Sequence, residues 1–257
     1  MRICRVSVAG AARWGAVEGD LVTLLAAPPW DGVRKVGGAM PLATAALLPP
    51  CEPSKILAVG LNYRAHAAEM GKELPEEPLI FLKAPSALLP PGGAVVLPRQ
   101  SSRVEHEGEL ALVIGKRATR VTAQEALAHV LGYTCLDDVT ARDIQHREKL
   151  YARAKGFDTF CPVGPWLETE VADPQRLDIA LRVNGELRQS GTTADMIFPV
   201  AEVIAFISHV MTLFPGDLVT TGTPPGVGRL AAGDRVDVEI SGIGTLSHTV
   251  VGGPGAA

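Results

Sequence analysis

The chain has 257 residues, of which 47% are hydrophobic and 20% are charged, so it can form a sizeable core and is not globally disordered. Its formal charge is -4 and it contains no basic run, which argues against nucleic acid as a partner. The four cysteines are widely spaced, which argues against a disulfide framework and a structural zinc site. A signal peptide and an apolar run of about 20 residues are both absent, so we expect a soluble cytoplasmic protein with no membrane contact.

The first part of the chain is expected to form a small β unit. Short apolar runs at residues 3–8, 13–17 and 21–25 alternate with glycines, a pattern typical of hairpins. Residues 26–55 are rich in proline and glycine, which predicts a loop with one short helix at residues 42–48. We therefore predict a small N-terminal β subdomain at residues 1–53 and a catalytic domain at residues 54–257.

A short helix is predicted between Asn62, as its N-cap, and Gly71, as the glycine that follows its end. His66 and Glu69 are three residues apart, so they share one face of this helix. This spacing suits a base and the carboxylate that orients it, but it is also common in ordinary surface pairs. The charged, proline-containing segment after the helix predicts a mobile surface loop.

Residues 104–115 read as one strand with two distinct faces. Glu107 and Glu109 lie on one face and His106 lies on the other. From Leu110 onward both faces are apolar, which is typical of a strand buried on both sides. The two carboxylates then point towards an interior, where like charges are costly unless they are protonated, paired or bound to a cation. A solvated acidic strand end is an equally open interpretation.

The rest of the pattern is mostly β, with few helices. Apolar runs predict strands at residues 55–59, 79–83, 132–138, 160–167, 178–183, 186–189, 217–223, 234–240 and 244–250. Helical spacing predicts helices at residues 122–131, 146–155 and 199–212. Because strands do not alternate regularly with helices, this order argues against a Rossmann domain and a TIM barrel. We predict a mostly β (α+β) fold.

Asp137 and Asp138 end one of these strands and must face opposite ways. One of them can complete an oxygen-only cluster with Glu107 and Glu109, and such a cluster suits Mg²⁺ or Mn²⁺ better than zinc. A simple turn explains the aspartate pair equally well. Groups that can bind an anionic substrate follow closely, at Arg142, Gln145 and Lys155.

Four motifs occur in an order that resembles the fumarylacetoacetate hydrolase family. They are His106-Glu107-Gly108-Glu109-Leu110, Leu136-Asp137-Asp138-Val139-Thr140-Ala141-Arg142-Asp143, Lys155-Gly156-Phe157-Asp158-Thr159 and Thr221-Gly222-Thr223-Pro224. The similarity runs from about residue 54 to the C-terminus, and residues 1–53 resemble the N-terminal segment of short bacterial members. The resemblance implies a mixed β-sandwich roll, with a small N-terminal β segment, in a homodimer.

The resemblance also implies roles for particular residues. It implies an Mg²⁺ or Mn²⁺ site at Glu107, Glu109 and Asp138, with Asp137 as a neighbour and Glu105 outside the coordination sphere. It further implies catalytic groups at His66, Glu69 and Lys155, and substrate-binding groups at Arg142, Gln145 and Thr223. One departure is His106, at a position that is often aromatic; because it points away from the carboxylates, we expect it to be structural.

The function implied is that of a divalent-metal-dependent isomerase and/or decarboxylase of 2-oxo or 2-hydroxy-dienoic dicarboxylates, acting through a metal-stabilised enolate. Similar members include the 2-hydroxyhepta-2,4-diene-1,7-dioate isomerases and 5-oxopent-3-ene-1,2,5-tricarboxylate decarboxylases of homoprotocatechuate breakdown. Acylpyruvate hydrolase and oxaloacetate decarboxylase are alternatives. A more remote alternative is a non-catalytic binding module in which the carboxylates hold a structural cation. The expected ligand is a small-molecule 2-oxo acid.

Overall fold

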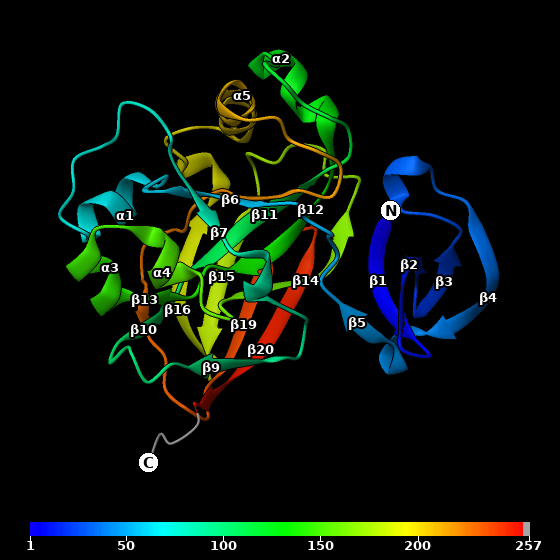
Figure 1. The fold of residues 1–257 in the computed structure, drawn as a ribbon, viewed down its shortest axis with the longest axis horizontal. Coiled ribbons are helices and arrows are strands. Elements are labelled where there is room, and N and C mark those ends of the chain that lie inside the picture. Colours follow the sequence, from blue (N-terminus) through cyan, green and yellow to red (C-terminus); the bar gives the residue numbers. More distant parts are fainter. Residues whose placement is uncertain (254–257) are drawn as a thin grey trace.

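Two β-sheets stack face to face in the computed structural model, which describes residues 1–253 (Figure 1). The 12 strands of the larger sheet are β1 (Arg2–Val8), β2 (Ala11–Glu18), β3 (Leu21–Leu25), β4 (Lys35–Pro41), β5 (Ala46–Leu48), β6 (Ile56–Gly60), β7 (Leu79–Lys83), β8 (Leu88–Leu89), β11 (Gly108–Ile114), β12 (Val130–Asp137), β14 (Cys161–Glu168) and β17 (Leu218–Thr220). Their spatial order is β4-β3-β2-β1-β14-β12-β11-β17-β6-β7, with β5 beside β1 and β8 beside β14.

The second layer is a sheet of 5 strands in the order β16-β15-β19-β20-β9. They are β9 (Ala94–Leu97), β15 (Asp178–Val183), β16 (Glu186–Thr192), β19 (Arg235–Ile240) and β20 (Gly244–Gly252). Strands β15, β19 and β20 contact β11, β12 and β14 of the larger sheet. A separate sheet of 3 strands has the order β13-β10-β18 and consists of β10 (Val104–His106), β13 (Thr140–Ala141) and β18 (Gly228–Arg229).

The helices are short and lie around the sheets (Figure 1). The α-helices are α1 (Arg64–Glu69), α2 (Ala123–Ala126), α3 (Arg142–Glu148), α4 (Tyr151–Lys155) and α5 (Val200–Val210). The 3-10 helices are η1 (Pro29–Asp31), η2 (Leu42–Thr44), η3 (Pro85–Ala87), η4 (Leu127–His129) and η5 (Thr193–Asp195). Helices α1, α3 and α4 gather on one side of the molecule in Figure 1, and α2 packs against α5 at another. Within residues 1–253, no helix is both long and apolar enough to cross a membrane.

Strand β11 is the centre of this arrangement because all of its residues are buried. Leu110 and Leu112 belong to the core cluster that includes the smaller sheet, whereas Ala111 and Val113 belong to a second cluster on the opposite face. Burying one such leucine contributes about 1.5–3 kcal/mol, so the alternation of this strand is strongly fixed. Glu109 is in phase with Ala111 and Val113, as predicted. The mostly β, mixed-sandwich fold is confirmed.

The N-terminal strands are part of the larger sheet, because Ile3 of β1 pairs with Leu167 of β14. The three predicted hairpin strands at the N-terminus are present as β1, β2 and β3. The helix predicted at residues 42–48 is wrong: η2 is a single 3-10 turn, and β5 then pairs with β1. Backbone pairing with β1 outweighs the weak helical preference of this short segment. The boundary at residue 53 stays a prediction.

Three other local predictions need correction. Asn62 is not the N-cap of α1; Tyr63 takes that position, and the Asn62 amide donates to the carbonyl oxygens of Phe198 and Thr221. The helix expected at residues 146–155 is broken between α3 and α4, where Lys149 has a φ of 55°. Strand β7 lies at the edge of its sheet and has exposed leucines, so it is not the buried strand that its apolar residues indicate.

Two local features have the geometry that their residue types favour. Thr122 and Glu125 form the capping box before α2, although this helix is shorter than expected because β12 begins at Val130. Asn184 and Gly185 both have positive φ values, 54° and 84°, as a type I′ hairpin turn requires.

Candidate active site

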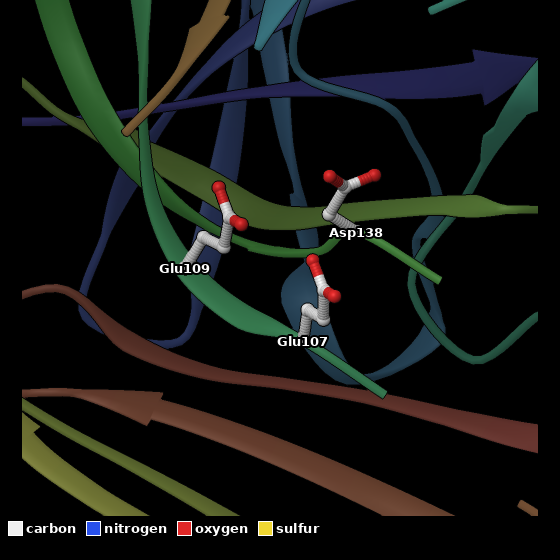
Figure 2. Close-up of side chains that lie close together, drawn as sticks. All are labelled: Glu107, Glu109 and Asp138. Atoms are coloured by element: carbon white, nitrogen blue, oxygen red, sulfur yellow. The ribbon is translucent and has the colours of Figure 1, made fainter. Parts of the chain in front are cut away.

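Three buried carboxylates meet where β11 begins and β12 ends. Because the two strands are antiparallel with Gly108 opposite Asp137, the flanking Glu107 and Asp138 lie side by side, and the Asp138 amide donates to the Glu107 carbonyl oxygen at 2.8 Å. Figure 2 shows the side chains of Glu107, Glu109 and Asp138 lying close together. One oxygen from each lies within 4.8 Å of the others. The sequence predicted this cluster of carboxylates.

The strand predicted at residues 104–115 is interrupted at Glu107, which separates β10 from β11. The Glu107 amide donates to the Asp137 carboxylate at 2.7 Å instead of to a neighbouring strand. The other Asp137 oxygen lies 2.8 Å from Nε2 of His248, and both side chains are completely buried. Asp137 therefore lies outside the carboxylate cluster and supports the backbone of Glu107.

Buried cations surround the cluster. Lys155 Nζ donates to Glu107 Oε2 at 2.6 Å and also to Asp138, while the Arg142 guanidinium bonds to both Glu107 and Glu105. Burial alone raises the pKa of Glu107, but the charges of Lys155 and Arg142 outweigh burial and hold that pKa below its ordinary value. Burial lowers the pKa of Lys155, and the nearby carboxylates of Asp138 and Glu107 more than reverse this, so the amine stays protonated.

Lys83 is a member of this charge network that the sequence analysis missed. Its side chain is fully buried, and its amine donates to Asp138, to the Lys155 carbonyl oxygen at 2.7 Å and to the Phe160 carbonyl oxygen at 3.0 Å. All three of its N–H donors are used. The signal was the lysine that ends the apolar run of residues 79–83, since a lysine at the end of a packed strand needs a partner.

Glu109 is the carboxylate without a cation. Thr220 and the Gly222 amide donate to its Oε2, but within residues 1–253 no lysine, arginine or histidine lies within ion-pair distance. Burial and the charge of Asp138 raise the pKa of Glu109 well above its ordinary value. A buried, cation-free carboxylate beside two others is the environment that a divalent cation stabilises. The residues present therefore fit an Mg²⁺ or Mn²⁺ ion.

His66 and Glu69 form the pair that their spacing predicted. His66 Nδ1 lies 3.0 Å from Glu69 Oε2, and the His66 side chain is buried. The other carboxylate oxygen of Glu69 accepts a hydrogen bond from the Gly226 amide at 3.0 Å, which ties the end of α1 to the loop after β17. This arrangement leaves Nε2 as the ring nitrogen that can exchange a proton with a ligand.

A small cavity lies beside the carboxylate cluster and connects it with His66. Its lining includes His66, Glu107, Arg142, Gln145 and Lys155, together with residues from the ends of α1 and β6, from β7 and from α4. A larger hollow elsewhere, lined by residues 96–100 and 157–159, contains none of the clustered carboxylates. We therefore place the site in the smaller, charged cavity.

The structure separates Thr223 from the other predicted substrate-binding residues. Thr223 does not line the cavity; its hydroxyl donates to the Gly108 carbonyl oxygen at 2.9 Å and accepts from Gln189 at 2.7 Å. Gln189, which no sequence signal marked, also lies 3.1 Å from the His106 ring. His106 is buried against Gln189, as expected of a structural residue. Glu105 lies outside the cluster, in a pair with Arg142.

Sequence comparison identifies the family of this fold and site. The profile described as Fumarylacetoacetate (FAA) hydrolase C-terminal matches residues 55–251. The chain belongs to the fumarylacetoacetate hydrolase family. A second profile, Rv2993c-like, N-terminal, matches residues 1–50 of this family member.

Relatives within the family are named for different reactions. Oxaloacetate tautomerase YisK of Bacillus subtilis is 46% identical over 212 residues, which cover 77% of this chain and 70% of that protein. The structure of 2-hydroxyhepta-2,4-diene-1,7-dioate isomerase from Mycobacterium marinum has a TM-score of 0.91 and 41% identity, covering 98% of each chain. The structure of 5-carboxymethyl-2-hydroxymuconate delta-isomerase from Mycobacterium smegmatis has a TM-score of 0.92 and 41% identity, covering 98% of this chain and 100% of that chain.

Proposed function

We propose that this family member is a divalent-cation-dependent isomerase that interconverts the enol and keto forms of a 2-oxo dicarboxylate. The observation that carries this proposal is the cavity that brings His66 together with Glu107 and Lys155. The reactions for which three relatives are named support it, because a tautomerase and two isomerases share the same proton-shifting chemistry. A homodimer and a cytoplasmic location remain part of the proposal.

The carboxylates of Glu107, Glu109 and Asp138 would hold the divalent cation. When bound, Mg²⁺ or Mn²⁺ supplies a Lewis acid that polarises the oxygens of a 2-oxo acid and favours charge on its 2-oxygen. Lys155 bridges Glu107 and Asp138, so a permanent positive charge lies at the same place. Anionic ligands therefore meet a site whose negative side chains are already largely neutralised by buried cations.

His66 is the group that can move the proton. Glu69 accepts from Nδ1–H, which fixes the tautomer in which Nε2 carries a lone pair toward the cavity. Nε2 can then remove a proton from the carbon next to the 2-oxo group, so that the electron pair of the broken C–H bond moves onto the 2-oxygen. Protonation of that oxygen gives the enol, and the same transfers in reverse return the proton to carbon and give the keto form. Arg142 and Gln145 also line the cavity, where their N–H groups can orient the substrate carboxylate.

One panel of substrates tests the reaction. Enol oxaloacetate, acetylpyruvate and a 2-hydroxydienoate are mixed with Mg²⁺- or Mn²⁺-loaded protein, and the loss of enol absorbance is followed alongside CO₂ and pyruvate. We expect enol loss without either product. Release of CO₂ would instead identify a decarboxylase, and release of pyruvate from acetylpyruvate would identify a carbon–carbon hydrolase. EDTA should abolish turnover; full activity of the metal-stripped protein would contradict the proposal.

Replacement of His66 by glutamine is expected to lower kcat by about 10²–10⁴-fold, the usual contribution of a positioned acid–base group. Affinity for Mg²⁺, measured by calorimetry, should not change because His66 is not a member of the carboxylate cluster. The matched control is His146→Gln, since this exposed histidine lies on α3 and does not line the cavity. Unchanged turnover in His66→Gln would favour a non-catalytic, cation-stabilised binding module.

A further inference from the structure

The cavity has a deep end and a rim with different properties. Glu107, Arg142 and Lys155 are buried at the deep end, next to the proposed cation. Lys72, Met70, Gln145 and Tyr151 also line it, and all four are partly or fully exposed. A ligand held by its 2-oxo acid end at the deep end therefore extends towards these rim residues.

Lys72 is the cation of the rim, and its charge is available to a ligand. The deep cations Arg142 and Lys155 are paired with Glu105, Glu107 and Asp138. By contrast, no carboxylate in the described part of the chain lies within ion-pair distance of Lys72. A positive side chain at the mouth of a partly enclosed cavity attracts the negative end of a ligand.

The position of Lys72 is coupled to the helix that carries His66. The Lys72 amide donates to the Ala67 carbonyl oxygen at 2.9 Å, directly after Gly71, whose φ of 63° ends the helix. The backbone of Lys72 is thereby fixed to α1, while its side chain keeps the reach to contact a ligand. A group bound by Lys72 is therefore held next to the helix that carries His66.

We propose that Lys72 binds the second carboxylate of a dicarboxylic substrate and so makes the site selective for dicarboxylates over monocarboxylates. This inference rests on the proposed function and names the residue that recognises the end of the substrate remote from the reacting atoms. Because this contact is made equally in the ground state and in the transition state, it lowers KM and leaves kcat nearly unchanged.

The kinetic test compares Lys72→Met, Lys72→Arg and the wild type on two matched substrates. Oxaloacetate carries a second carboxylate where 2-oxobutyrate has a methyl group. Deuterium exchange at carbon 3 measures the turnover of both substrates. Lys72→Met is expected to raise KM for oxaloacetate about tenfold, the effect of losing one charge-assisted contact. KM for 2-oxobutyrate should not change, and Lys72→Arg should recover most of the oxaloacetate affinity. Lys116→Met, at an exposed lysine outside the cavity, is the control.

A binding test separates this inference from the proposed reaction. Malate and 2-hydroxybutyrate cannot enolise, so calorimetry of Mg²⁺-loaded protein measures their affinity without turnover. Weaker malate binding by Lys72→Met, with unchanged affinity for 2-hydroxybutyrate, supports the role of Lys72. Failure of the wild type to turn over oxaloacetate would overturn only the proposed reaction and would leave this binding result valid. Equal oxaloacetate KM and equal malate affinity in Lys72→Met and wild type would overturn the role of Lys72.

Discussion

Glu109→Gln is expected to abolish measurable Mg²⁺ binding and to lower turnover by more than about 100-fold, because loss of a residue that merely supports a metal ligand already costs 10–100-fold. The substitution removes the carboxylate that has no cation partner in the protein itself. Calorimetric titration with Mg²⁺ and the enol assay measure the two effects. Retained Mg²⁺ affinity would show that the ion does not bind at Glu109.

In the metal-free protein, by contrast, Glu109→Gln is expected to gain stability relative to the wild type as pH rises. Since burial and Asp138 raise the pKa of Glu109, the folded protein binds the proton more tightly than the unfolded chain does. The wild type should therefore lose stability relative to Glu109→Gln as pH rises above the ordinary value of 4.5 and through the raised pKa. Urea unfolding in EDTA between about pH 5 and 8 measures this difference.

The control for this pH dependence is Glu73→Gln, at an exposed carboxylate in the loop after α1. Its stability should follow that of the wild type at every pH. If the free energies of unfolding of wild type and Glu109→Gln differ by the same amount at every pH, ionisation of Glu109 does not destabilise the metal-free protein. The electrostatic argument for a cation at this position would then be wrong.

The carboxylate cluster could be predicted because its information is local. Alternation along one strand places Glu107 and Glu109 on one face, and two consecutive aspartates at a strand end must diverge. Antiparallel pairing then brings Asp138 beside Glu107. The ordered motifs add the family, whose fold matches the structure. The strand pattern therefore brought the two glutamates together, whereas the family resemblance selected Asp138 rather than Asp137 as the third carboxylate.

The charge network around the cluster could not be predicted in the same way. Lys83 meets Asp138 across 55 residues of sequence, and Gln189 meets Thr223 across 34. Such contacts depend on the packing of whole elements, which periodicity does not report. The break at Glu107 has the same origin, since its amide is taken by the Asp137 side chain. Local sequence patterns therefore predict the carboxylates, whereas the ion pairs that neutralise them depend on tertiary packing.

Lys155→Met is expected to destabilise the metal-free protein by about 3 kcal/mol, the lower end of the cost of breaking a buried ion pair. The amine is 4% exposed and is shared by Glu107 and Asp138, so its loss leaves two buried carboxylates with less compensating charge. Arg142 and Lys83 still contact these carboxylates, which is why the lower value applies. Urea unfolding in EDTA measures the loss, and Lys116→Met is the exposed control.

Addition of Mg²⁺ should restore much of this stability, because a divalent cation supplies the positive charge that the variant lacks. The increase in Tm on adding Mg²⁺ is therefore expected to be larger for Lys155→Met than for wild type, since an ion that binds the folded state stabilises it by mass action. Turnover should nevertheless stay low, because the restored charge does not replace the N–H donors of Lys155 in the cavity. An equal Tm increase in both proteins would mean that the ion and Lys155 do not share the same carboxylates.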